Sequence, residues 1–139
     1  MDMQKALADC LVLNTVTAAR TLVRRYDAKL KPHGVTIQQF SLLAAIRFHP
    51  GEPVAVLAQR ILLDRTSLTR NLDLLEAKGL IRRVGTTGNA RLCELSKKGD
   101  ALLNRLFDEW RLAQAELMAG LEGDDATRYL EVSRQLAQG

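Results

Sequence analysis

Residues 63–81, LDRTSLTRNLDLLEAKGLI, predict a helix with one apolar face and one polar face. Asp64 is a suitable N-cap, the helix is expected to cover Arg65–Lys78, and Gly79 suits the C′ position that follows it. The apolar face consists of residues at helical spacing, namely Leu68, Leu72 and Leu75. This pattern predicts a helix that packs on a core through its leucines and leaves its polar side exposed.

The polar side of this helix carries hydroxyl and guanidinium groups close to its N-terminus. We predict DNA contacts for Arg65, Thr66, Ser67, Thr69, Arg70 and Asn71. An arginine can donate two hydrogen bonds to guanine, serine and threonine contact bases or phosphates, and a helix N-terminus offers N–H groups to a phosphate. Asp73 would oppose DNA unless it accepts from a cytosine amine or pairs with Arg70. A polar face turned to solvent is the alternative interpretation.

The segments before residues 63–81 predict three more helices. Their expected positions are Met3–Lys31, a helix from Thr36 to residues 49–51, and a helix after Pro53 that covers residues 54–61. Pro32 and Gly34 end the first of these helices. Thr36 and Gln39 form a capping-box pattern at the start of the second.

The segments after residues 63–81 predict a β-hairpin and two helices. Their expected positions are a strand over residues 80–84, a turn over 85–89, a strand over 91–95, a helix from Ser96 to Gly123 and a short helix from about Asp124. A tight turn joins the two central helices, and the hairpin follows at once. The predicted fold class is therefore mainly α with a small β-hairpin, a winged helix-turn-helix domain flanked by N- and C-terminal helices.

Composition and charge narrow the class of protein. The 139 residues are 47% hydrophobic and 26% charged, which is typical of one globular domain. No apolar run approaches the roughly 20 residues that cross a bilayer, the N-terminus lacks a signal-peptide pattern, and two cysteines make no disulfide framework, so we expect a cytoplasmic protein. Residues 60–98 carry nine basic and four acidic residues, a net charge of +5, whereas the rest carries −1. Such an excess favours phosphate contact, with a solvated surface as the alternative.

The predicted hairpin carries three arginines that we assign to DNA. Arg82 and Arg83 lie at its base, and Arg91 lies on the returning strand. A basic wing can lie along the DNA backbone or enter the minor groove, where narrow A·T tracts attract arginine. A short surface hairpin kept soluble by its charges is the alternative.

Three segments of the chain resemble the MarR family of transcriptional regulators. Residues 63–81 resemble its recognition-helix segment, and Leu95–Gly99 resembles the Leu-Thr-x-x-Gly that follows its wing. The region Arg20–Leu43 resembles its first linker through Tyr26-Asp27, Pro32, Gly34-Val35-Thr36 and Gln39-Phe40. The match covers nearly the whole chain, and residues 63–81 are its most specific part.

The resemblance implies a sequence-specific regulator of transcription, a repressor that a small molecule modulates. The expected partners are double-stranded palindromic operator DNA, a second copy of the chain in a homodimer with interlocked terminal helices, and a small organic effector. We expect a single domain over residues 1–139, with dimerisation helices at about 1–35 and 97–139 and a winged-helix DNA-binding region at about 36–96. The apolar stripes of the first and last helices independently favour a dimer.

The wing departs from the family pattern. Family members usually carry an Asp-x-Arg pair just before the second strand, where this chain has Thr87 and Asn89. The wing is also expected to be short, with Gly85–Gly88 at its tip. Arg91 is the substitute that we expect for the usual minor-groove arginine.

Two further expectations concern regulation. Cys10 lies near the place where some family members keep a peroxide-sensing cysteine, but no basic residue follows within one helical turn to activate its thiol. A buried, inert thiol is the alternative. The resemblance also implies a ligand pocket between the dimerisation helices and the winged region, where we expect His33, Phe40 and Trp110. An exposed loop histidine is the alternative for His33.

The sequence contains no motif of catalysis. Its two histidines, His33 and His49, each lie beside a proline, and there is no Gly-rich phosphate loop, zinc-ligand spacing or nucleophile motif. We therefore expect no enzyme activity, no metal and no cofactor. The alternative functions are a winged-helix module that binds protein instead of DNA and a redox-responsive regulator that uses Cys10.

Overall fold

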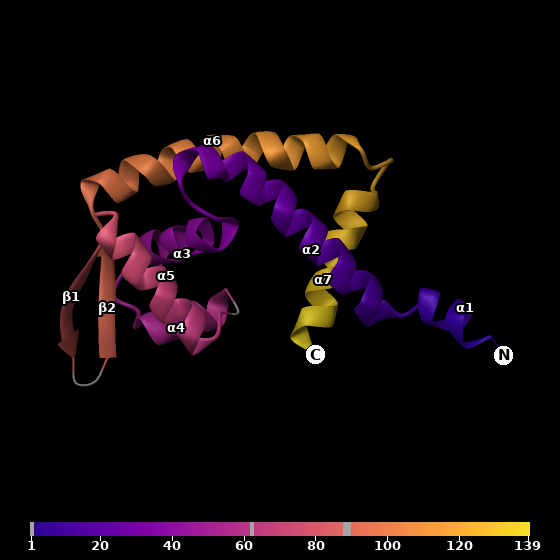
Figure 1. Ribbon diagram of the computed structural model, residues 1–139, viewed down its shortest axis with the longest axis horizontal. Helices are drawn as coiled ribbons and strands as arrows, with labels where there is room; N and C mark the ends of the chain where they lie inside the picture. The colour runs from indigo at the N-terminus through magenta and orange to yellow at the C-terminus, as the bar shows by residue number, and fades with distance from the viewer. Residues whose placement is uncertain (1, 62, 88–89) are drawn as a thin grey trace.

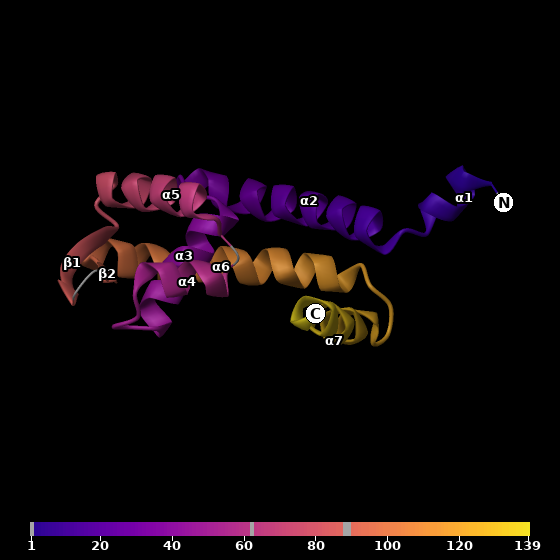
Figure 2. The ribbon, with the colours of Figure 1, turned by 90° about the horizontal axis from the view of Figure 1, so that it is seen from below.

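A computed structural model describes residues 2–61, 63–87 and 90–139, and the side chains of residues 86–91 lie outside that description. Its elements in chain order are α1 (Met3–Ala8), α2 (Leu11–Leu30), the 3-10 helix η1 (Lys31–His33), α3 (Ile37–Phe48), α4 (Val54–Arg60), α5 (Arg65–Ala77), β1 (Ile81–Thr87), β2 (Ala90–Leu95), α6 (Lys97–Ala119) and α7 (Asp125–Gln138). Helices α3, α4 and α5 and the hairpin lie at one end of the molecule (Figure 1). Helices α2 and α6 extend from there toward the other end, where α1 and α7 lie (Figure 2).

The core lies where the ends of α2 and α6 meet the winged region. Its completely buried large side chains are Leu30, Leu42, Leu43, Leu57, Leu75, Ile81 and Leu106. Burial of one such side chain stabilises the fold by about 1.5–3 kcal/mol. Because Leu30 comes from α2 and Leu106 from α6, both long helices are anchored in the same core as α5. None of the described helices is long and apolar enough to span a membrane.

The helix that we predicted over Met3–Lys31 is interrupted, which corrects that prediction. Cys10 has an extended backbone, with a ψ of 122°, and acts as the N-cap of α2. The side-chain amide of Asn14 donates to the carbonyl oxygens of Ala8 at 2.9 Å and Cys10 at 2.8 Å. A side chain thus satisfies backbone groups at the break. No residue described in α1 is buried, so no core packing favours a continuous helix.

Two other predicted boundaries also differ from the structure. Helix α6 ends at Ala119 rather than at Gly123, because the N–H of Gly120 already turns back to the carbonyl oxygen of Leu117. Leu121, which we placed on the apolar stripe of this helix, therefore lies beyond it. Strand β1 continues to Thr87, past the predicted end at residue 84. The remainder of the predicted turn, residues 88 and 89, lies outside the described residues.

The hairpin is antiparallel and joins α5 to α6. Ile81 pairs with Leu95 and Arg82 with Glu94, and the register becomes irregular between Val84 and Thr87. The sheet has the order β1–β2, as the sequence pattern predicts.

The segment Leu95–Gly99 docks α6 on the end of α5. The hydroxyl of Ser96 donates to the carbonyl oxygen of Gly79 at 2.6 Å and accepts from the N–H of Gly99 at 3.0 Å. A Cβ atom at Gly99 would lie 2.0 Å from the carbonyl oxygen of Leu80. Only glycine permits this close approach without a backbone shift. The segment therefore fixes where the hairpin begins relative to α5.

Candidate nucleic-acid interface

Helix α5 begins at an acidic N-cap, as predicted. A carboxylate oxygen of Asp64 accepts the N–H of Ser67 at 2.7 Å, and the other accepts the Ser67 hydroxyl at 3.2 Å. The hydrogen bond from the backbone N–H has the largest effect, and together the two bonds hold the pKa of Asp64 below its usual range. The cap therefore stays ionised at neutral pH. The Ser67 hydroxyl, for which we predicted a DNA contact, is half-buried and engaged within the protein.

The leucine face of α5 is buried, which confirms its predicted role. Leu68, Leu72 and Leu75 are all core residues. Asn71 shares this face: it is 6% exposed, and its side-chain oxygen accepts from the Gln39 amide at 3.1 Å. The prediction that Asn71 contacts DNA is therefore wrong for this structure. Helical spacing places Asn71 on the leucine face, three residues after Leu68 and four before Leu75, but its partner lies 32 positions earlier in the chain.

The opposite face of α5 is exposed and rich in hydrogen-bond donors. The residues around one hollow on this face are Arg65, Thr66, Thr69, Arg70, Asp73 and Leu74. Among the described residues, neither Arg65 nor Arg70 forms an ion pair. Two guanidinium groups and two hydroxyls near a helix N-terminus suit base edges and phosphates of a DNA groove.

The wing arginines differ in their contacts. Arg83 contacts Asp73 of α5 at 2.5 Å and Glu76 at 3.8 Å, so its guanidinium joins the wing to α5. The DNA contact of Arg83 stays a prediction, and Asp73 pairs with this wing residue instead of Arg70. Arg82 pairs with Glu94 across the hairpin at 2.6 Å, and its side chain remains 67% exposed. The side chain of Arg91 lies outside the described residues.

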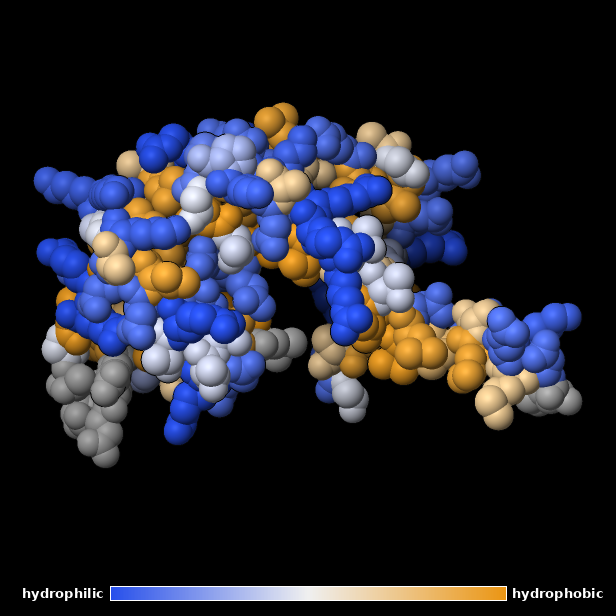
Figure 3. All heavy atoms as spheres, in the orientation of Figure 1, coloured by the Kyte–Doolittle hydropathy of each residue, from blue (hydrophilic) through white to orange (hydrophobic). Residues whose placement is uncertain are grey.

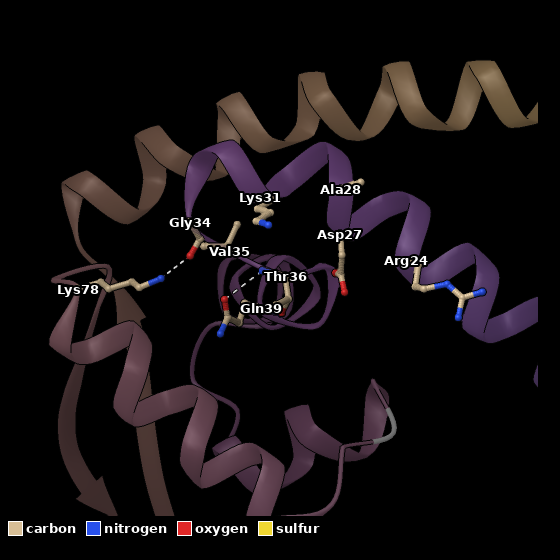
Figure 4. Close-up of a pocket in the computed structure, with 9 residues that line it drawn as sticks. All are labelled: Arg24, Asp27, Ala28, Lys31, Gly34, Val35, Thr36, Gln39 and Lys78. Atoms are coloured by element: carbon tan, nitrogen blue, oxygen red, sulfur yellow. Dashed lines mark hydrogen bonds between the residues drawn. The ribbon is translucent and has the colours of Figure 1, made fainter.

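A hollow of about 640 Å³ lies between α2 and the start of α3 (Figure 4). The residues that line it are Arg24, Asp27, Ala28, Lys31, Gly34, Val35, Thr36, Gln39 and Lys78. The Lys78 ammonium donates to the carbonyl oxygen of Gly34, which joins the end of α5 to the turn before α3 (Figure 4). Three cationic side chains against one carboxylate make this hollow suitable for an anionic group.

The residues that we predicted for a ligand pocket do not line this hollow. His33 lies 3.7 Å from the Glu109 carboxylate, Phe40 packs against the core, and Trp110 stacks on Phe107 with ring centroids 5.7 Å apart. The grouping of these three residues in a ligand pocket stays a prediction. One signal was present in the sequence, because residues 24, 27, 28 and 31 share one helix face. The approach of Lys78 depends on the fold and has no such signal.

Both cysteines are half-buried and free. Burial raises the pKa of the Cys93 thiol. Cys10 lies at the break between α1 and α2, and its redox role stays a prediction that Cys10→Ser tests through the oxidant sensitivity of DNA binding. No group of His, Cys, Asp and Glu side chains suited to a metal ion occurs in the part of the chain that is described.

Comparison with known proteins agrees with this arrangement. A family model described as the MarR family matches residues 33–92. The transcriptional regulator MosR of M. tuberculosis, solved in complex with DNA, is 36% identical over 94% of this chain and 97% of that one, with a TM-score of 0.78. The chain belongs to the MarR family. The regulator PecS of Dickeya dadantii (strain 3937) is 26% identical over 124 residues, which is 84% of this chain and 74% of PecS.

The MarR fold extends to more distant structures. PcaV of Streptomyces coelicolor, solved with its natural ligand, has a TM-score of 0.81 at 22% identity, over 96% of this chain and 95% of that one. Membership of the family makes the chain a DNA-binding transcriptional regulator and not an enzyme. The resemblance, the fold class and the absence of enzyme activity predicted from the sequence are thereby confirmed.

Proposed function

We propose that the chain is a homodimeric repressor that binds near-palindromic duplex DNA and responds to a small organic effector. The observation that carries this proposal is the exposed face of α5, where Arg65 and Arg70 form no ion pair within the described part of the protein. Such a regulator acts on chromosomal DNA, and we place it in the cytoplasm. MosR, which was solved with DNA, supports the same role for this chain.

Each exposed group has a proposed contact. Arg70 donates to a guanine edge in the major groove, because arginine is the commonest partner of guanine. Thr66, Thr69 and Arg65 contact bases or phosphates near the helix N-terminus. Arg82 on the wing contacts the DNA backbone, and we assign Arg91 the same region. These contacts fall within the proposed DNA-binding region, residues 36–96 of a single domain that covers 1–139.

The terminal segments, residues 1–35 and 97–139, are the proposed dimerisation helices. Apolar side chains gather over α1 and the neighbouring part of α2 (Figure 3). Large exposed apolar residues of the terminal helices include Leu7, Leu11, Val12, Leu13, Leu112, Tyr129, Val132 and Leu136. A soluble monomer rarely leaves a large apolar patch in contact with water. A two-fold dimer would cover it and present two copies of α5 to adjacent turns of DNA.

The hollow beside α2 is the proposed effector site. It lies between α2, a proposed dimerisation helix, and the start of α3, and its cationic side chains Arg24, Lys31 and Lys78 favour a small organic anion. PcaV, which shares the fold and was solved with its natural ligand, is consistent with a ligand-responsive regulator. Isothermal titration with aromatic and aliphatic carboxylates, against a Lys31→Glu variant, tests this site.

The first experiment measures binding to genomic fragments that flank the gene of the protein, against random duplex at several salt concentrations. The proposal predicts tight binding to a fragment with a near-palindrome and weaker, more salt-dependent binding to random duplex. Equal affinity for both would contradict sequence recognition. No binding in any salt would favour the alternative of a protein-interaction module.

A further inference from the structure

Gln39 and Asn71 are the two buried polar side chains among the described residues, and they contact each other. Each is 6% exposed, and the Gln39 Nε2 donates to the Asn71 Oδ1 at 3.1 Å. Burying amide groups is unfavourable unless they are hydrogen-bonded, so this pair imposes a geometric requirement on the two helices that carry it. Gln39 belongs to α3 and Asn71 to α5.

The side-chain oxygen of Gln39 is hydrogen-bonded as well. Its Oε1 accepts the backbone N–H of Thr36 at 3.1 Å, and the Thr36 hydroxyl accepts the Gln39 N–H at 3.2 Å (Figure 4). The adjacent N–H of Ile37 donates to the Asp27 carboxylate of α2 at 2.7 Å. Side-chain hydrogen bonds therefore run from α2, through the start of α3, to the middle of α5.

The remaining contacts of α5 differ in kind from this bond. Leu68, Leu72 and Leu75 attach the helix to the core, but apolar contacts are largely non-directional. Lys78 fixes only the C-terminal end of α5, and Arg83 reaches it from the exposed side. On the buried side, in the described residues, the bond to Gln39 is the directional contact that constrains rotation of α5 about its axis.

We propose that Gln39 is a positioning residue for DNA recognition and that it couples the orientation of α5 to α2. Asn71 directly follows Arg70, so the angle between the two side chains is set by helix geometry at about 100°. A hydrogen bond that holds Asn71 toward α3 thereby holds Arg70 toward the groove. This inference rests on the proposed function of α5. Because Asp27, Thr36 and Gln39 also line the hollow beside α2, a molecule bound there would lie directly against these bonds.

The test compares three variants with the wild-type protein. Gln39→Leu removes the bond to Asn71 and leaves a buried amide unpaired. The double variant Gln39→Leu/Asn71→Leu removes both buried amides, so it recovers the stability lost through the unpaired Asn71 amide, whereas the Thr36 N–H still lacks the Gln39 acceptor. Ile46→Val is the matched control: it weakens the core packing of α3 and leaves every one of these hydrogen bonds in place. The measurements are the urea midpoint and the ratio of two Kd values, that for random duplex divided by that for the selected duplex. The selected duplex is the near-palindromic fragment that the wild-type protein binds most tightly.

Wild-type protein must first show a ratio well above one, and its failure to do so would contradict the proposed function itself. Gln39→Leu should lower this ratio about fivefold, the usual worth of one hydrogen bond, without change in the salt slope. The double variant should recover part of the lost urea midpoint but not the ratio, and Ile46→Val should lose stability and keep the wild-type ratio. The positioning role would be overturned if Gln39→Leu kept the wild-type ratio. It would also be overturned if the double variant recovered the ratio together with its stability.

Discussion

The charges of α5 are divided between those used inside the protein and those left for a partner. Asp64 holds the first turn through Ser67, and Asp73 is paired with Arg83. The charge of Asp73 is thus compensated by Arg83, whereas Asp64 stays ionised and its oxygens are engaged by Ser67. Arg65 and Arg70 remain exposed without an ion pair in the described chain, so the net effect of this face on a nucleic acid is attractive.

The replacement Arg70→Ala tests the most specific of the proposed contacts. If Arg70 donates to a base, its loss should cost about 1–3 kcal/mol on the selected duplex and much less on random duplex. Fluorescence anisotropy with both duplexes measures this difference. Arg105→Ala removes another exposed arginine, from α6, and should change neither affinity. An equal loss on both duplexes would assign Arg70 to phosphate contact instead.

The N-cap of α5 predicts a pH dependence of stability. The pKa of Asp64 is lowered in the folded protein, so its stabilising contribution is present above the unfolded pKa of about 3.9 and is lost as pH falls through the folded value. Asp64→Asn keeps an acceptor for the Ser67 N–H but does not titrate there. Urea midpoints measured from pH 6 to pH 3 should therefore fall more steeply for wild type than for Asp64→Asn. Parallel curves would contradict this role of the cap.

At the scale of elements, the contact between the wing and α5 is the feature that differs from the sequence-based prediction. Arg83 lies on β1, yet its guanidinium contacts two carboxylates of α5. A wing arginine thus compensates an acidic residue that would otherwise face the phosphates. The orientation of the hairpin and the charge of α5 are consequently linked.

We expect Arg83→Ala to weaken binding to all duplexes a few-fold, because it leaves Asp73 unpaired near the DNA. The ion pair itself, which is partly exposed, should contribute only about 0.2–1 kcal/mol to folding stability. Asp73→Asn in the Arg83→Ala background should restore most of the DNA affinity, as measured by anisotropy. If Arg83 instead contacts a phosphate, the second change will restore nothing and the salt slope will fall by about 0.9.

The sequence predicted the elements of the winged region well because their signals are local. The Thr36 cap, the leucine spacing of α5 and the glycine after it each act within a few residues, and all three appear in the structure. The partners of Asn71 and Arg83 could not be predicted in this way. They depend on how α3 packs on α5 and how the hairpin twists, which no local pattern specifies. Local patterns likewise gave no indication of the Asn14 bonds at the break after α1.

At the scale of the whole molecule, the exposed apolar surface is concentrated away from the winged region. Helix α7 has no buried residue, although Tyr129, Val132 and Leu136 form one apolar face. An amphipathic helix gains little stability in water unless its apolar face is covered. We attribute this face to the dimer interface.

The replacement Leu136→Asp should shift the protein from dimer to monomer at micromolar concentration, because it would bury an unpaired charge in an apolar interface. Sedimentation velocity measures the change directly. Arg134→Asp introduces the same residue on the opposite side of α7 and should leave the dimer intact. A wild-type profile for Leu136→Asp, or a monomeric wild type, would contradict the proposed interface.

The central claim is that two copies of α5, held by a two-fold dimer, recognise adjacent turns of one duplex. Selection of bound duplexes from a randomised pool by the wild-type protein tests it most directly. The account predicts enrichment of an inverted repeat whose half-sites are centred roughly 10 base pairs apart, one turn of DNA. Enrichment of a single unrepeated motif, or no enrichment at all, would contradict it.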